Sequence, residues 1–349
     1  MKDKMKAVVK TSQAPGYEYM EVDVPTIGPG DVLIKVKATT ICGSDIHAFH
    51  SSPGIMHLLT LPRIVGHEGC GEVAAVGDYV SNIKKGDIVS PEPHIFCGHC
   101  YYCQTGAALN CQNMKLLGHN ADGVFAEYVK VPATDCWKHP VGTSFELGAI
   151  HEPMGVAVHG VLAGDISGKS VAVFGCGPIG LFAIGAATVF GAARVFGLEV
   201  APKRLAMARK LFPGLTFINP VEQDAVRIIT GATDGLGVDV SIELSGNGAA
   251  IQQAFKVLRR EGRVSLIGIP SKPVELEVNK DIIFKEARVF GVFGREVWLT
   301  WWRVRNLLDM GKFDPMPVIT HRFPLVDYEE AIEMAESGEA GKVLLYPGE

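Results

Sequence analysis

Residues 171–191, VAVFGCGPIGLFAIGAATVFG, decide the fold class of this chain. The β-branched and aromatic residues at 171–174 predict a buried strand, and the apolar run from 178 onward predicts a buried helix. The turn between them fits the pattern G-x-G-x-x-G with Gly175, Gly177, Pro178, Ile179 and Gly180. In this strand–turn–helix context, the glycines allow a tight turn and let backbone N–H groups and the helix N-terminus approach a pyrophosphate. The stretch therefore predicts a dinucleotide-binding loop.

Strand–helix alternation continues beyond this loop. RVFGLE at 194–199 precedes a predicted helix over 202–212, and DVSIEL at 239–244 precedes one over 249–260 and a strand RVSLIGI. Units of this length predict an α/β domain with a doubly wound parallel sheet. Glu199 ends the second strand, where a carboxylate binds adenosine ribose hydroxyls and repels a 2′-phosphate. We therefore expect NAD rather than NADP, although Arg204 is a nearby arginine that could accept that phosphate.

The residues before this domain have a different pattern. Short alternating runs between turn signals, such as KAVVK, DVLIKVKAT, GEVAAVG and FAEYVKVP, predict a compact, mainly β domain. The C-terminal segment contains an aromatic helix, WLTWWRVRNLLDMG, an acidic helix, YEEAIEMAESG, and a last strand, KVLLYP. We assign this segment to the first domain. The expected domains are residues 1–157, with 297–349 returning to them, and residues 158–296.

Bulk composition excludes several classes of protein. The chain has 349 residues, 47% of them hydrophobic, and a net charge of −5, so no basic surplus favours a nucleic-acid partner. Residues 171–193 lack charge, but their glycines and proline favour a strand, turn and helix over a membrane span. The charged start, MKDKMKAVVK, lacks the apolar core of a signal peptide. We expect a cytoplasmic protein with a small-molecule substrate and no nucleic-acid or membrane partner.

Four cysteines within fifteen positions form a second motif, in the stretch IFCGHCYYCQTGAALNC: Cys97, Cys100, Cys103 and Cys111. Disulfides are rare in the reducing cytosol, which disfavours a disulfide pair. The C-x2-C-x2-C start also occurs in ferredoxins, but there the fourth cysteine follows three residues later, before a proline. Four thiolates on a tight loop form a closed tetrahedral shell typical of structural zinc. We expect structural zinc, with an iron–sulfur cluster or a disulfide as alternatives.

A second group of candidate metal ligands lies outside this loop: Cys42, His67, Glu68 and Glu152. A catalytic zinc needs about three protein ligands and an open position for water or substrate. Each of these residues has an ordinary structural explanation when it is considered alone, such as a buried thiol or an acid at a helix start. Taken together and beside the dinucleotide motif, they predict a catalytic metal site.

At this point the chain resembles the zinc-dependent medium-chain alcohol dehydrogenases over its full length. The resemblance rests on Cys-Gly-Ser-Asp-x-His at 42–47, Gly-His-Glu at 66–68, the four-cysteine loop, the dinucleotide motif and Gly-Lys-Val at 341–343. It implies a GroES-like catalytic domain and a Rossmann domain, with two zinc ions per chain. Cys42 and His67 would bind the catalytic zinc with Glu68 or Glu152. Ser44 and His47 would carry the alcohol proton to solvent, with Glu152 as a modulator.

The resemblance also suggests a homo-oligomer, a dimer or a tetramer. Further candidate cofactor contacts are Leu266, Ile267, Gly268, Gly291 and Val292.

Some residues indicate a particular substrate within the family. The segment 289–321, with Gly-Arg before a tryptophan-rich helix and then Ile-Thr-His, resembles the L-threonine 3-dehydrogenase branch, as does His94. Arg295 is the candidate partner for a substrate carboxylate, because a guanidinium can hold it bidentately. Val156 after Gly155 is instead similar to polyol and butanediol dehydrogenases. We therefore expect NAD-linked oxidation of L-threonine to 2-amino-3-ketobutyrate, with a polyol or vicinal diol as the alternative.

Overall fold

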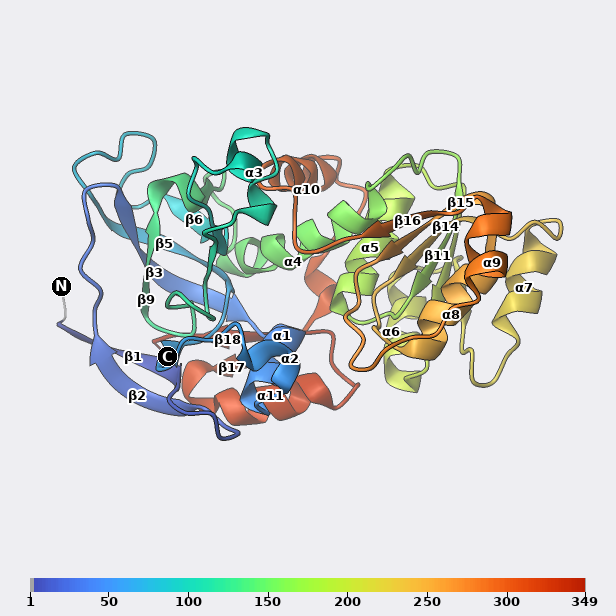
Figure 1. Ribbon diagram of the computed structural model, residues 1–349. Coiled ribbons are helices and arrows are strands. Elements are labelled where there is room, and N and C mark those ends of the chain that lie inside the picture. Colours follow the sequence, from blue (N-terminus) through green and yellow to red (C-terminus); the bar gives the residue numbers. More distant parts are fainter. Residues whose placement is uncertain (1–2, 349) are drawn as a thin grey trace. The chain divides into compact units, whose positions relative to one another are not determined.

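The computed structural model describes residues 3–348, which form two compact units (Figure 1). One unit contains the residues up to Pro153 together with those from Ile319 onward, and the other contains Met154–Val318. The long helix α4 (Phe145–Val161) includes the boundary between them. Each unit has its own sheet system and its own hydrophobic core.

The first unit is built on a seven-stranded sheet in the order β10–β6–β5–β3–β18–β17, with β9 also paired to β3. Its strands are β3 (Asp31–Thr40), β5 (Glu68–Val76), β6 (Ile88–Pro91), β9 (Tyr128–Pro132), β10 (Cys136–Lys138), β17 (Ile319–Pro324) and β18 (Lys342–Tyr346). Alternating apolar residues of β3, including Val32, Ile34 and Val36, point into the core. The C-terminal strand β18 pairs with β3, which brings Lys342 beside residues that lie near position 40.

Smaller elements complete the first unit. A three-stranded sheet pairs β2 (Glu18–Asp23), β1 (Lys4–Lys10) and β4 (Arg63–Ile64), and a two-stranded sheet pairs β7 (His94–Ile95) with β8 (Lys115–Leu116). Its helices are α1 (Gly43–Phe49), α2 (Pro53–Met56), α3 (Tyr101–Gln104) and α11 (Tyr328–Glu336). The GroES-like prediction of a mainly β domain agrees with this architecture.

The second unit has a six-stranded, fully parallel sheet in the order β13–β12–β11–β14–β15–β16. Its strands are β11 (Ser170–Phe174), β12 (Arg194–Leu198), β13 (Thr216–Ile218), β14 (Val238–Glu243), β15 (Leu258–Leu266) and β16 (Arg288–Gly291). Its helices after α4 are α5 (Pro178–Val189), α6 (Pro202–Leu211), α7 (Ala225–Ala232), α8 (Gly248–Lys256), α9 (Val278–Asp281) and α10 (Leu299–Asp309). This strand order confirms the predicted doubly wound Rossmann sheet.

Two expectations differ from the structure. The predicted helix over 249–260 ends at Lys256, because Leu258 is buried and pairs with Val238, which starts β15 earlier than expected. The aromatic helix α10 forms as predicted but lies in the second unit, whereas we assigned residues from 297 to the first domain. The chain that follows α10 stays in the second unit because the Phe313 ring stacks on Phe212, with 5.8 Å between ring centroids.

Helices long and apolar enough to cross a membrane are absent from residues 3–348. The uncharged stretch 171–193 forms β11 and α5, as the sequence predicted.

Candidate active site and cofactor site

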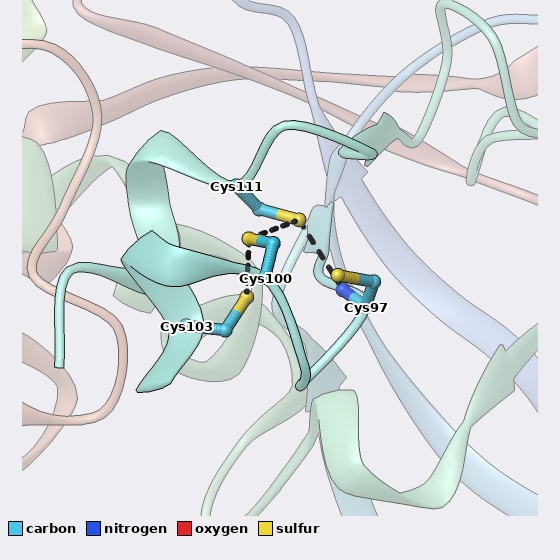
Figure 2. Close-up of side chains that lie close together, drawn as sticks. All are labelled: Cys97, Cys100, Cys103 and Cys111. Carbon is cyan, nitrogen blue, oxygen red and sulfur yellow. Dashed lines mark hydrogen bonds between the residues drawn. The ribbon is translucent and has the colours of Figure 1, made fainter. Parts of the chain in front are cut away.

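The four cysteines of the loop converge on one point (Figure 2). Their sulfur atoms all lie within 4.8 Å of one another, with 3.5 Å from Cys100 to Cys103 and 3.9 Å from Cys100 to Cys111. A disulfide requires about 2.05 Å between sulfurs, and all four cysteines are free. A tetrahedral zinc with Zn–S bonds of about 2.3 Å places its ligands about 3.8 Å apart. The spacing therefore fits a closed four-sulfur zinc site.

Backbone and side-chain donors contact two of these sulfurs, those of Cys97 and Cys111. The backbone N–H groups of Cys97 and Asn113 donate to Cys111 Sγ at 3.3 and 3.4 Å. The backbone N–H of His99 is the main cause that lowers the pKa of the Cys97 thiol to about 5, and Asn113 adds to it. Thiolate is the form that binds metal, so these donors favour ligation.

A second cluster joins Cys42, His67 and Glu68, whose ligand atoms also lie within 4.8 Å of one another. Cys42 precedes α1, whereas His67 and Glu68 lie at the start of β5. His67 and Glu68 are buried, and Cys42 is half-buried. A thiol, an imidazole and a carboxylate form a mixed donor set typical of a catalytic zinc site. The structure thus brings together three of the four candidate ligands, Cys42, His67 and Glu68.

Glu68 is fixed by partners on two other strands. Its carboxylate lies 2.5 Å from the ammonium of Lys342 on β18, and it accepts a hydrogen bond from the Thr40 hydroxyl on β3. Burial raises the pKa of Glu68 and the neighbouring charge of Glu152 adds to this rise, while Lys342 opposes it. Lys342 is itself 3% exposed, so the pair is buried. Sequence reasoning missed Lys342, although the closing Gly-Lys-Val motif was the available signal.

Asp45 provides the corresponding support for His67. Asp45 Oδ1 lies 3.5 Å from His67 Nδ1, and Asp45 Oδ2 accepts a hydrogen bond from the Cys42 backbone N–H at 2.8 Å. Burial disfavours the charged imidazole, but the negative charges of Asp45 and Cys42 raise the pKa of His67 well above its usual value. A site that favours a proton this strongly also favours a metal cation. Carboxylates of this kind orient metal-binding histidines, and the sequence prediction did not assign Asp45 a role.

The other predicted catalytic residues lie on helices. Glu152 is buried on α4 and is not one of the three residues that converge with Cys42 in the described structure, although its charge acts on Glu68. Ser44 and His47 lie on α1, three residues apart and therefore on the same face. Ser44 is half-buried, whereas His47 is exposed to solvent.

The predicted dinucleotide loop borders a cavity of about 790 Å³ in the second unit. The loop and cofactor candidates that line it are Gly175, Gly177, Pro178, Ile179, Gly180, Glu199 and Arg204. A Cβ at position 180 would lie 1.9 Å from the Gly175 carbonyl oxygen, so only glycine allows this close approach. The remaining candidates, Leu266, Ile267, Gly268, Gly291 and Val292, follow or end β15 and β16 and are not among the lining residues.

Glu199 and Arg204 favour different cofactors, NAD and NADP respectively. The Glu199 carboxylate is buried and accepts backbone N–H bonds from Cys176 at 2.8 Å, Val200 at 2.8 Å and Ala201 at 2.9 Å. It thereby ties the dinucleotide loop to the start of α6. Arg204 Nε is buried and has no hydrogen-bond partner within residues 3–348. The acceptor for ribose hydroxyls and a cation able to meet a phosphate therefore line the same cavity.

The two predicted substrate residues are both buried. His94 Nδ1 lies 2.7 Å from Glu92 Oε1 in the first unit. Arg295, in the second unit, is 1% exposed, and its Cζ lies 6.0 Å from the centre of the Trp301 ring. A Cβ at Gly155 would lie 2.3 Å from Arg295 Cδ, so glycine at 155 makes room for this side chain.

Comparisons with known proteins agree with this geometry. The family described as "Alcohol dehydrogenase GroES-like domain" matches residues 28–141, and the family described as "Zinc-binding dehydrogenase" matches residues 178–310. An L-threonine 3-dehydrogenase of Pyrococcus abyssi is 46% identical over 345 residues, which is 99% of each chain.

Two solved structures are similar over nearly the whole chain. The 2R,3R-butanediol dehydrogenase of Bacillus subtilis has a TM-score of 0.89 and 33% identity, covering 99% of this chain and 100% of that one. A protein from Sinorhizobium meliloti 1021 bound to NADP has a TM-score of 0.91 and 32% identity, with the same coverage. These matches extend over both units and both metal clusters. The chain belongs to the zinc-dependent medium-chain alcohol dehydrogenase family.

Proposed function

We propose that this chain oxidises L-threonine to 2-amino-3-ketobutyrate with NAD as the hydride acceptor. The observation that carries the proposal is the 46% identity over 99% of both chains with an enzyme named for this reaction. A vicinal diol is the second candidate, because the butanediol dehydrogenase of Bacillus subtilis is similar over the full chain. Both substrates are small secondary alcohols with a polar group on the adjacent carbon.

Two zinc ions per chain are part of this proposal. The four cysteines would hold a structural ion, and Cys42 and His67 would hold a catalytic one with Glu68 or Glu152 as the third ligand. When bound there, zinc supplies a Lewis acid that lowers the pKa of the substrate hydroxyl. Asp45 orients His67 for this role, and Lys342 balances the charge of Glu68.

Ser44 and His47 would then move the hydroxyl proton out of the site. They lie one helical turn apart on α1, and exposure rises from the half-buried Ser44 to the exposed His47. The Ser44 hydroxyl can accept a proton from the substrate side and donate its own proton toward solvent. The exposed His47 imidazole can then release a proton to water. His47 is therefore the proposed exit, and Glu152 is a proposed modulator of the metal.

NAD rather than NADP is proposed as the cofactor because Glu199 presents a buried carboxylate to the cavity. Its charge would repel a 2′-phosphate and accept hydrogen bonds from ribose hydroxyls. NADP is the alternative cofactor, because the similar structure from Sinorhizobium meliloti is bound to NADP. Arg204 is the residue that would bind its 2′-phosphate.

Arg295 is the proposed partner of the threonine carboxylate. Replacement of Arg295 by Lys should lower kcat/KM for L-threonine about 10- to 150-fold more than for 2,3-butanediol, since one charge-assisted hydrogen bond is lost. Arg303→Lys is the matched control, because Arg303 pairs with Glu296 at 2.7 Å at a partly exposed position. Equal losses on both substrates would assign Arg295 to structure alone.

The experiment that tests the proposal is a substrate panel on zinc-loaded protein. NADH formation is followed with L-threonine, 2,3-butanediol, sorbitol and simple secondary alcohols, and zinc content is measured on the same sample. We expect the highest kcat/KM for L-threonine and two zinc ions per chain. Turnover of the diol without turnover of threonine would replace the first candidate by the second.

We also propose that the protein forms a homodimer or tetramer through the edge strand β16. All four β16 residues are exposed, including Val289 at 43% and Phe290 at 37%. An apolar edge strand with unpaired backbone groups is a template for pairing with a second copy. Phe290→Glu should therefore reduce the mass measured by light scattering, whereas Val141→Glu, at a fully exposed control position, should not.

A further inference from the structure

Glu243 is a buried carboxylate that the proposed reaction does not use. It ends β14, and its side chain is 0% exposed. Its oxygens accept hydrogen bonds from the Ser245 backbone N–H at 2.8 Å, from the Ser245 hydroxyl, and from the Gly246 backbone N–H at 3.2 Å. Every one of these partners is a donor, which is the environment of an ionised carboxylate.

The charge on Glu243 has no cationic counterpart. No lysine, arginine or histidine of residues 3–348 forms an ion pair with it, in contrast to Glu68 and its partner Lys342. Burial raises the pKa of Glu243, and the Ser245 and Gly246 donors oppose that rise. Buried carboxylates are normally paired with a cation, because an uncompensated charge in the interior is costly. An unpaired one therefore needs an explanation.

The position of Glu243 supplies that explanation. The strand order reverses between β11 and β14, and ligands of such sheets bind outside the carboxyl ends of the strands at this reversal. Glu199 marks the adenosine half of the cavity on the β12 side. The second half of a dinucleotide then lies on the side of β14, β15 and β16.

Glu243 also lies directly beneath the loops that would line this second half. Ser245 borders the cavity, and a Cβ at Gly175 would lie 3.3 Å from Ser245 N. On the other side, a Cβ at Gly268 would lie 2.8 Å from Glu243 Oε2 and 2.1 Å from Gly246 N. The loops that follow β14 and β15 thus pack closely against each other beside the carboxylate.

We propose that Glu243 discriminates between the two oxidation states of the bound cofactor by favouring the cationic, oxidised nicotinamide over the neutral, reduced one. The inference rests on the proposed binding of a nicotinamide dinucleotide. Adenosine and pyrophosphate are identical in NAD⁺ and NADH, so their interaction with Glu243 cancels in a comparison of the two. Only the nicotinamide ring changes charge, and the uncompensated carboxylate of Glu243 at the end of β14 interacts differently with the two ring states.

The consequence for turnover follows from the sign of the charge. A fixed negative charge lowers the affinity for NADH relative to NAD⁺, so it promotes exchange of reduced for oxidised cofactor after each reaction. In dehydrogenation, where release of product can limit kcat, this exchange favours continued oxidation of the alcohol. Glu243 acts here as a positioning and electrostatic residue, because it touches loop donors rather than the reacting atoms.

The test measures dissociation constants of NAD⁺ and NADH by calorimetry and by NADH fluorescence on the zinc-loaded protein without substrate. In Glu243→Gln the ratio Kd(NAD⁺)/Kd(NADH) should rise on the order of tenfold, because the variant removes a buried negative charge that attracts only the oxidised ring. Glu243→Asp retains the charge and should keep the wild-type ratio. Ser245→Ala removes one donor but no charge, and it should weaken both nucleotides in parallel.

Different outcomes test the role of Glu243 and the proposed nicotinamide cofactor. Equal weakening of both nucleotides in Glu243→Gln would make Glu243 a loop anchor only and overturn the inference. A wild-type protein that binds neither nucleotide would instead overturn the proposed cofactor. If Glu243→Gln does not fold, Glu243→Met gives the same ratio test, because it removes the charge without setting an amide N–H₂ against the Ser245 and Gly246 donors.

Discussion

Replacement of Glu199 by Ala tests both the stability and the cofactor preference of the second unit. The carboxylate accepts three backbone N–H bonds, from Cys176, Val200 and Ala201. The Val200 side chain is 55% exposed and Ala201 is half-buried, so water can reach the N–H groups of these two residues. Cys176 is 0% exposed, and its N–H would lose its acceptor in the dry interior.

The magnitude follows from that single buried donor. Loss of a hydrogen bond to a charged group costs about 1.5–3 kcal/mol, so the free energy of unfolding should fall by that amount. Chemical denaturation without cofactor measures this change. Glu222→Ala is the control. Glu222 is an exposed glutamate of the same unit, and its side chain forms no hydrogen bond in the described structure.

The same variant should alter nucleotide affinity in opposite directions. The Kd for NAD⁺ should rise about tenfold or more, because a charged ribose acceptor is lost. The Kd for NADP⁺ should fall, because the repulsive charge is gone while Arg204 Nε remains available in the cavity. A wild-type protein that already prefers NADP⁺ would refute the reasoning and give Arg204 the deciding role. Unchanged stability would show that water replaces the carboxylate even at Cys176.

Three further changes test other parts of the chain. Cys100→Ser should remove one zinc ion by metal analysis and lower the unfolding temperature, since thiolate ligation contributes folding energy; retention of two zinc ions, or an iron–sulfur absorption band, would contradict the assignment. Glu146 and Arg322 form a bidentate pair at 2.9 Å that lowers the pKa of Glu146 below 4.5. This stabilisation is present above about pH 4.5 and is lost as pH falls through the folded-state pKa, so Glu146→Gln should cost under about 1 kcal/mol at neutral pH and nothing in acid. Lys342→Met leaves Glu68 buried and unpaired, and it should destabilise the metal-free protein by about 3–5 kcal/mol but the zinc-loaded protein less; equal losses in denaturation with and without zinc would refute a role for Lys342 beside the metal.

The parts of the structure that were predictable from sequence are those with a local cause. The dinucleotide loop needs three glycines within six positions, and its strand and helix follow at once in the chain. The four cysteines lie within fifteen positions, so their convergence needs only a short loop. Cys42 and His67 are further apart, so no spacing rule joins them. Their residue types beside the dinucleotide motif predicted a metal site, and the family resemblance then implied their roles as ligands.

The residues that sequence reasoning missed depend on long-range pairing. Lys342 reaches Glu68, 274 positions earlier in the chain, only because β18 pairs with β3. Asp45 lies in a quoted motif, but its role depends on where β5 places His67. The early start of β15 has the same origin, since its pairing with β14 overrides the local helical pattern of residues 258–260. Pairing partners of this kind are set by the whole sheet.

The Glu68–Lys342 pair would affect how Glu68 binds a metal at the candidate catalytic site. Both Glu68 oxygens contact the Lys342 ammonium, at 2.7 and 2.5 Å, and one of them also accepts from Thr40. A zinc ion beside Cys42 and His67 would compete with Lys342 for the same carboxylate. Because one cation is always present, Glu68 can approach or leave the metal without ever standing unpaired in the interior, and the usual cost of an uncompensated buried charge does not arise. In the proposed zinc site, Glu68 would therefore suit an exchangeable ligand position.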